Sequence, residues 1–172
     1  MTTFQIRPLT ESDAAPFREL RLRGLREYPT AFSASYEEDE EVTVGEIAQR
    51  LSPKPNGTIF GAFRGDVLAG VAGVQREQRQ KLAHKAFIWG VYVAPEARNG
   101  GMGAALLREA LRYAAGLGVR QVNLSVNAQN TAALELYRKM GFVEFGLERD
   151  FLLVDGVLHD EIHMVFRVPE AP

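Results

Sequence analysis

The sequence contains no cysteine among its 172 residues. Disulfide bonds, thiolate metal sites and a covalent thiol nucleophile are therefore all excluded. It also has no hydrophobic run approaching the roughly 20 consecutive apolar residues of a membrane span. The first segment, "MTTFQIRPL", lacks the basic-then-apolar pattern of a signal peptide. We expect a cytoplasmic protein that does not contact a membrane.

Neither sign of charge dominates, because 20 Lys and Arg residues nearly balance 22 Asp and Glu residues. The formal net charge of −2 argues against a nucleic-acid partner, although a basic groove can sit on a neutral protein. Hydrophobic residues make up 46% of the chain and charged residues 24%, as in folded globular proteins. No repeat or long linker divides the chain, so we expect one domain with one core.

Helical patterns occur in four segments. Phe17, Leu20 and Leu25 recur at helical spacing after the start signals Thr10 and Asp13. The segment 37–51 contains a capping box at Thr43 and Glu46 and an apolar face made of Val44, Ile47, Ala48 and Leu51. The other two segments are 102–117, which ends at glycine stop signals, and 130–140, which begins at an asparagine cap.

Strand patterns fill the segments between these helices. Apolar runs lie at 5–9, on both sides of the turn "RGD" at 64–66, at 86–93, at 120–126, and on both sides of Asp155-Gly156. The run "AFIWGVYV", Ala86–Val93, is apolar on both faces, which places it in the middle of a sheet. The order of strands and helices predicts an α/β fold with a sheet of mixed direction.

A glycine-rich loop separates this central strand from the third helix. The stretch "VAPEARNGGMGAALL", Val93–Leu107, holds one arginine and three glycines within four positions. Backbone without side chains lets N–H groups point into one cavity, and the helix N-terminus adds partial positive charge, so the loop suits a phosphate or pyrophosphate. In the alternative interpretation the glycines only permit tight packing. The dinucleotide and NTPase phosphate-loop patterns do not match, because Leu106, Ala104 and Ala105 stand at their required positions.

Two motifs together resemble the GNAT superfamily of N-acetyltransferases. Arg98 to Gly103 form an R-x-x-G-x-G loop after "WGVYVAPEA", and Asn130 to Phe142, "NTAALELYRKMGF", match the family's N-x-x-A-x-x-L-Y-x-x-x-G-F helix. The resemblance covers about residues 4–168. It implies an α/β GNAT fold, with a central mixed β-sheet of six to seven strands flanked by about four helices. It also implies acetyl-CoA as cosubstrate and no metal.

The resemblance implies a set of site residues. In the family, the strand before the loop carries a bulge, here expected at Gly90, and its backbone pairs with the pantetheine arm. Tyr137 matches the tyrosine that protonates the leaving thiolate, and a phenol is protonated at neutral pH. In the alternative interpretation Tyr137 only packs. The residues expected to bind the cofactor are Val91, Tyr92, Val93, Arg98, Asn99, Gly100, Gly101, Met102, Gly103, Ala104 and Asn130.

The acceptor side is less defined by the sequence. Many relatives place a glutamate base before the bulge, whereas "HKAFIW", His84–Trp89, holds no carboxylate. His84 and a water chain to Asn123 or Ser125 are equal contenders, so no base is assigned. The acidic stretch Ser35–Glu41 has two interpretations: it attracts a cationic amine, or it is a solvated loop. The solvated loop is preferred. His159 and His163 share a strand face but lack a third ligand, so they are interpreted as structural or exposed.

The leading hypothesis is an enzyme that transfers an acetyl group from acetyl-CoA to a primary amine by direct attack in a ternary complex. The acceptor is a small-molecule amine or a peptide N-terminus. The alternative is a catalytically inactive CoA-binding regulatory domain, which the missing base carboxylate favours and Tyr137 opposes. The last strands mediate pairing in relatives, so a homodimer is also considered.

Overall fold

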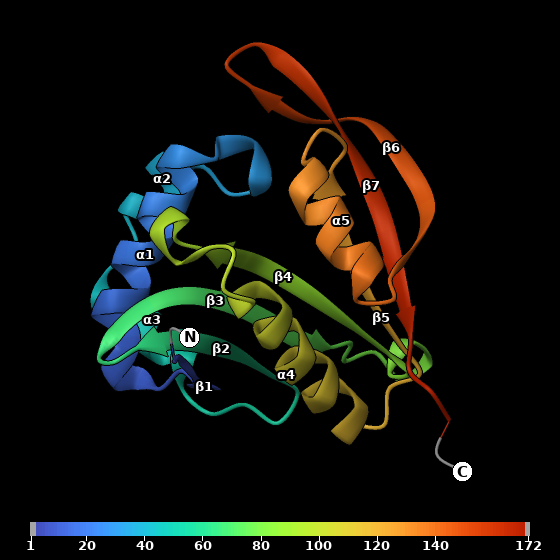
Figure 1. Ribbon diagram of the computed structural model, residues 1–172, viewed down its shortest axis with the longest axis horizontal. Helices are drawn as coiled ribbons and strands as arrows, with labels where there is room; N and C mark the ends of the chain where they lie inside the picture. Colours follow the sequence, from blue (N-terminus) through green and yellow to red (C-terminus); the bar gives the residue numbers. More distant parts are fainter. Residues whose placement is uncertain (1–2, 171–172) are drawn as a thin grey trace.

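A computed structural model describes residues 3–170 and contains a seven-stranded sheet with helices on both faces (Figure 1). The strand order is β1-β2-β3-β4-β5-β7-β6, and β4–β5 is the parallel pair in an otherwise antiparallel sheet. The expected mixed α/β sheet is confirmed. The strands are β1 Gln5–Pro8, β2 Gly57–Arg64, β3 Val67–Arg76, β4 Lys85–Val93, β5 Gln121–Asn127, β6 Val143–Val154 and β7 Val157–Arg167.

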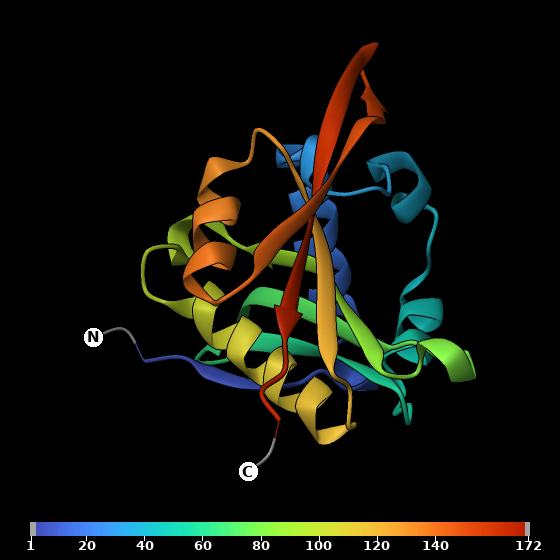
Figure 2. The same ribbon diagram turned by 90° about the vertical axis from the view of Figure 1, so that its right-hand side faces the viewer.

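Residues 3–170 contain five α-helices, one more than expected. They are α1 Ala14–Glu27, α2 Tyr36–Glu40, α3 Val44–Leu51, α4 Met102–Gly116 and α5 Thr131–Lys139. Helix α4 lies against β1 to β4 on the face opposite α1 and α3 (Figure 2). The part of the chain described by the structure holds no helix long and apolar enough to cross a membrane.

The extra helix, α2, occupies the acidic stretch Ser35–Glu41, which was interpreted as a solvated loop before the helix capped at Thr43. Ser35 and Glu38 form a capping box, in which the Glu38 backbone N–H donates to Ser35 Oγ at 3.2 Å and the Ser35 N–H to Glu38 Oε2 at 2.9 Å. The Ser-x-x-Glu spacing is visible in the sequence and signals this start. Asp39 is half-buried and forms an ion pair with Arg21 of α1, so the stretch is more than a solvated segment.

The apolar faces of the helices supply the core. Phe17, Leu20 and Leu25 of α1 are buried as expected, and so are Leu106 and Leu107 of α4. On α3 the capping box of Thr43 and Glu46 is confirmed, with Ile47 and Leu51 buried. Val44, assigned to the same apolar face, is instead 45% exposed. It is the first residue of the helix and lies at its solvent-facing end, where the remaining core side chains do not reach.

Strands β4 and β5 separate soon after they meet, which opens the sheet at its centre (Figure 1). Their parallel pairing extends only from Lys85 to Phe87 of β4. Gly90 has a φ of +62°, and the register between β3 and β4 shifts between Val71 and Gly73. The expected bulge at Gly90 is therefore confirmed, and a left-handed backbone at this point favours glycine.

Strands β6 and β7 form a hairpin that projects beyond the rest of the molecule (Figure 2). Its tight turn is Asp155-Gly156, with φ values of +49° and +76°, as expected for a two-residue hairpin turn. Strand β6 is the last strand of the sheet, and its outer edge has no strand partner within residues 3–170.

Candidate functional site

The glycine-rich loop between β4 and α4 presents a row of free backbone N–H groups. The N–H groups of residues 99–104 donate to no acceptor among residues 3–170. Asn99 and Gly101 have φ values of +63° and +79°, which turn the chain sharply into the helix. The first amides of a helix have no partner within the helix, and this turn adds further amides beside them. The arrangement can hold an anion.

The glycines of this loop have different roles. A side chain at Gly101 would meet no atom within 4 Å, but the positive φ there disfavours residues with a Cβ. At Gly103 a Cβ would lie 3.2 Å from Leu136 Cδ2, so this glycine lets α4 approach α5. The tight-packing interpretation therefore applies to Gly103, while the bare backbone at Gly101 serves the turn.

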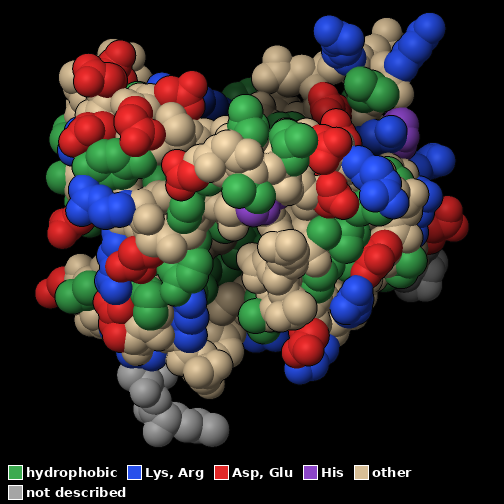
Figure 3. All heavy atoms as spheres, turned by 90° about the horizontal axis from the view of Figure 1, so that it is seen from above, with side chains coloured by type: hydrophobic (Ala, Val, Ile, Leu, Met, Phe, Trp, Pro, Cys, Tyr) green, Lys and Arg blue, Asp and Glu red, His purple; other side chains and the backbone are tan. Residues whose placement is uncertain are grey.

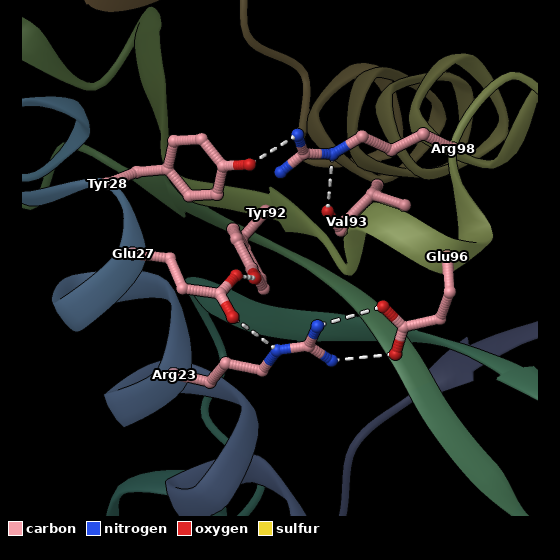
Figure 4. A network of polar contacts seen from close by, with 7 residues as sticks. All are labelled: Arg23, Glu27, Tyr28, Tyr92, Val93, Glu96 and Arg98. Atoms are coloured by element: carbon pink, nitrogen blue, oxygen red, sulfur yellow. Dashed lines mark hydrogen bonds and ion pairs between the residues drawn. The ribbon is translucent and has the colours of Figure 1, made fainter.

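Arg98 lies against the end of β4 and the end of α1 (Figure 4). Its Nε donates to Val93 O at 2.9 Å, and its Nη1 donates to the Tyr28 hydroxyl at 2.9 Å. The guanidinium also lies 4.6 Å from the centre of the Tyr28 ring. These contacts hold the loop in place and leave Nη2 without a hydrogen-bond partner in the described part of the chain.

An ion-pair network next to Arg98 links α1 to the segment that follows β4 (Figure 4). Arg23 donates to both carboxylate oxygens of Glu96, at 2.6 and 2.9 Å, and holds the pKa of the Glu96 carboxyl down at about 2. It also donates to Glu27, which accepts the Tyr92 hydroxyl at 3.1 Å. Burial, followed by this hydrogen bond to Glu27, raises the pKa of Tyr92 to about 12. The Tyr92 side chain is thus buried on the α1 side, and only its backbone borders the opening in the sheet.

Helix α5 carries the expected catalytic residue Tyr137, and the expected cofactor-binding residue Asn130 stands directly before it. Asn130 caps the helix, because its Oδ1 accepts from the Ala133 N–H at 3.2 Å. Tyr137 is 7% exposed, and its ring contacts Phe142 edge-to-face with centroids 5.9 Å apart. Burial raises the pKa of Tyr137 to about 12, so its hydroxyl stays protonated and can donate a hydrogen bond.

A cavity of about 400 Å³ lies where β4 and β5 diverge. Figure 3 looks onto this end of the molecule, where hydrophobic side chains surround a histidine. The cavity reaches the Gly90 bulge on β4 and extends to β5 and β7. Its lining comprises Arg21, residues 30–34, 87–90 and 123–125, Phe145, Phe151, Leu152, Glu161 and His163.

A larger cavity of about 620 Å³ lies between α1, α3 and the sheet. It shares Arg21 and Trp89 with the smaller cavity, so these side chains stand between the two. A Cβ at Gly73 would lie 2.3 Å from the Trp89 ring, so glycine at this position lets the indole lie across β3. The smaller cavity is the one that reaches the bulge and the open edge of β4, and chemistry at the bulge would take place there.

A family model decides the assignment: the acetyltransferase (GNAT) family matches residues 19–142. The chain belongs to the GNAT family. It is 39% identical over 102 residues to N-alpha-acetyltransferase RimI of Mycobacterium tuberculosis, covering 59% of this chain and 62% of that protein. It is 30% identical over 124 residues to a mycothiol acetyltransferase of Pseudarthrobacter chlorophenolicus, covering 69% of this chain and 38% of that protein. The chain therefore spans less than two thirds of either relative.

Solved structures agree on the GNAT fold. The acetyltransferase of the GNAT family from Streptococcus pneumoniae has a TM-score of 0.84 at 25% identity, covering 96% of this chain and all of the other. The acetyltransferase yncA from Salmonella typhimurium, solved with its cofactor acetyl-CoA, has a TM-score of 0.85 at 18% identity, covering 99% and 96%. At 25% and 18% sequence identity, the structural similarity shows that these proteins share the fold of this chain.

On the acceptor side of this GNAT domain, the structure separates the residues considered as bases. His84 precedes β4, is exposed, and does not line the cavity at the bulge. Asn123 and Ser125 do line it, from β5. His159 and His163 both lie on β7, and only His163 reaches the cavity. The interpretation of His163 as structural or exposed did not include its position at the cavity, because its neighbours come from β5 and β6.

Proposed function

We propose that this GNAT domain transfers an acetyl group from acetyl-CoA to a primary amine by direct attack in a ternary complex. One observation carries the proposal: the row of free loop amides follows strand β4, whose edge toward β5 has no strand partner beyond Phe87 among residues 3–170. Together they match a ligand with a pyrophosphate followed by an extended amide-bearing arm. The acetyl-CoA bound to the similar fold of yncA supports this choice of ligand.

The cofactor arm would pair with the backbone of Val91 to Val93, and the pyrophosphate would accept from the amides of residues 99–104 and from Arg98 Nη2. Asn130 at the start of α5 would contact the cofactor from the other side of the opening. A backbone N–H near Val91 would donate to the thioester oxygen. Polarising this carbonyl stabilises the negative charge that develops on it during attack.

The amine nitrogen would then attack the thioester carbon, which forms the C–N bond while the C–S bond breaks. The electron pair of that bond goes to sulfur, and the hydroxyl of Tyr137 donates its proton to the departing thiolate. Because the chain has no cysteine, no thiol is present to carry the acetyl group between the two substrates.

The acceptor would enter the 400 Å³ cavity, whose lining combines the aromatic Phe87 and Trp89 with the carboxylate of Glu161. This lining suits an amine attached to an apolar or peptide-like group. A peptide N-terminus or a small-molecule amine is the proposed acceptor, and the name of the relative RimI favours the first. The alternative, an inactive CoA-binding domain, predicts that no free thiol appears when acetyl-CoA is mixed with a panel of amines.

Asn99→Asp tests the pyrophosphate site by adding one negative charge without changing the shape of the loop. Aspartate tolerates the left-handed backbone at this position. We expect CoA to bind about 5- to 30-fold more weakly, because a like charge close to the pyrophosphate costs about 1–2 kcal/mol near a surface. Calorimetric titration at low salt measures this. Asn56→Asp, the same change in the turn before β2, is the control, and equal affinity in the two variants would contradict the site.

The hairpin β6–β7 supports a second part of the proposal, a homodimer. Seven large apolar side chains on it are at least 38% exposed: Val143, Phe145, Leu147, Phe151, Leu153, Val157 and Leu158. Five of them belong to β6, whose outer edge has no strand partner among residues 3–170, and exposed apolar side chains at a free sheet edge are typical of an interface. A second copy of the chain would cover this surface symmetrically.

Leu153→Asp tests the dimer. Leu153 is 69% exposed and pairs across the hairpin with Leu158, so a carboxylate here would be buried without a partner in a dimer. We expect the mass measured by light scattering during gel filtration to fall to that of one chain. Val67→Asp is the control, because Val67 is 68% exposed at the start of β3. A wild-type protein that already has the mass of one chain at micromolar concentration would refute the dimer.

A further inference from the structure

Three polar side chains from three strands form a hydrogen-bonded chain beside the cavity, which two of them, Ser125 and His163, line. Ser125 of β5 and His163 of β7 are directly paired in the sheet, and Ser125 Oγ lies 2.7 Å from His163 Nδ1. His163 Nε2 lies 3.0 Å from Glu148 Oε2 of β6. The His163 side chain is 28% exposed, so the imidazole is shielded from bulk water but not sealed off.

The chemistry of Glu148 and Ser125 determines which ring nitrogen of His163 carries the hydrogen. An ionised carboxylate only accepts, so the Nε2 of a neutral His163 carries the hydrogen and donates it to Glu148. Nδ1 then has a free lone pair and accepts the hydroxyl hydrogen of Ser125. The remaining lone pairs of Ser125 Oγ are available to a donor in the cavity, which Ser125 lines. When His163 takes up a second proton, Glu148 stabilises the imidazolium.

The charged groups around His163 differ in what they can do. Glu161 also lines the cavity from β7, and burial raises the pKa of its carboxyl. Arg21 faces the cavity from α1, but its guanidinium is paired with Asp39. Among these groups His163 combines a lone pair, a hydrogen-bonded relay toward the cavity and a carboxylate behind it.

We propose that His163 is the base that takes the proton of the acceptor amine, with the Ser125 hydroxyl as the relay and Glu148 as a positioning residue. This rests on the proposed acetyl transfer. As the C–N bond forms, the N–H proton passes to Ser125 Oγ, and the hydroxyl proton of Ser125 passes to His163 Nδ1. The sulfur receives its proton from Tyr137, so the products are the amide and free CoA thiol. The arrangement replaces the carboxylate missing between His84 and Trp89.

The kinetic test compares His163→Gln with His159→Gln, a matched change on the same strand outside the cavity. The acceptors are putrescine and a peptide with a free α-amine, and kcat is measured against pH. For wild type and His159→Gln we expect kcat to fall as the pH is lowered, because the protonated imidazole cannot accept a proton. His163→Gln should lose this acid limb and about 10- to 100-fold of kcat, with unchanged CoA affinity. Ser125→Ala should lower kcat less, because water can replace the hydroxyl.

Two outcomes, one kinetic and one from mass spectrometry, would overturn the relay. If Glu161→Gln removes the acid limb and His163→Gln leaves it, Glu161 is the base. If mass spectrometry finds acetylated Ser125 after mixing with acetyl-CoA, the serine is a covalent nucleophile instead.

A measurement independent of turnover separates this proposal from the proposed function. In ¹H–¹⁵N spectra of the whole chain, we expect the neutral His163 ring to carry its hydrogen on Nε2, and Ser125→Ala to shift the Nδ1 resonance. A hydrogen on Nδ1 refutes the relay even if wild type acetylates both amines. If neither amine is acetylated but CoA binds and the Nε2 hydrogen is present, acetyl transfer to these amines is refuted while the hydrogen-bonded chain stands.

Discussion

Tyr137→Phe is expected to lower kcat by about 10- to 100-fold while CoA affinity stays unchanged. The variant keeps the ring and its edge-to-face contact with Phe142, so only the hydroxyl is lost. A hydrogen bond to a charged group contributes about 1.5–3 kcal/mol, which converts to this range of rates. The hydroxyl forms a hydrogen bond to the charge that develops on sulfur before its proton moves, and this hydrogen bond sets the expected size of the effect.

The pH dependence of this effect follows from the burial of Tyr137. Its pKa is raised to about 12, so the hydroxyl stays protonated from pH 6 to pH 10. The ratio of wild-type to variant kcat should therefore be constant over that range. Tyr113→Phe on α4 is the control, since it removes a phenol hydroxyl away from α5. Equal kcat for wild type and Tyr137→Phe would leave Tyr137 as a packing residue at the edge of the cofactor site.

Asp13→Asn is expected to lower the free energy of unfolding by about 2 kcal/mol at pH 7. Asp13 is buried and accepts hydrogen bonds from both Nη atoms of Arg7, at 2.7 and 2.8 Å, and from the Thr10 backbone N–H at 2.8 Å. These contacts tie β1 to the start of α1. The asparagine side chain has no negative charge. Its NH₂ group cannot accept, so it either faces one of these donors or leaves that donor without its hydrogen bond. Urea unfolding measures the difference, and Glu19→Gln on the exposed face of α1 is the control.

Acid should remove this difference in stability between wild type and Asp13→Asn. Hydrogen bonds from Arg7 hold the pKa of Asp13 down at about 2, compared with about 4 in an unfolded chain. A lowered carboxyl pKa stabilises the fold above the unfolded value, and the contribution is lost as pH falls through the folded value. Wild type and Asp13→Asn should thus converge in stability between about pH 4 and pH 2. A constant difference across that window would show that the ion pair does not carry the effect.

Local patterns were sufficient to predict most of the fold. The buried face of α1, the stop at Gly118 after α4, and the Asp155-Gly156 turn each depend on residues within a few positions of one another. The two errors in the predicted fold, at Val44 and at α2, also come from reliance on local patterns. Val44 fits the helical period of α3, yet whether a position on that period reaches the core depends on what lies beside it. The helix α2 was missed because its run of acids was weighed as charge, whereas its capping box marks a helix start.

The sequence by itself determined the elements of the proposed cofactor site. The bare loop from Asn99 to Ala104, the cap at Asn130 and the position of Tyr137 lie within two short motifs, and each motif folds as one strand-to-helix or helical unit. Only the tertiary structure brought together the residues of the proposed acceptor site. Ser125 and His163 are 38 positions apart, and they meet because β5 and β7 pair in one register. A slip of one residue would turn the two side chains to opposite faces of the sheet, and no local pattern specifies that pairing.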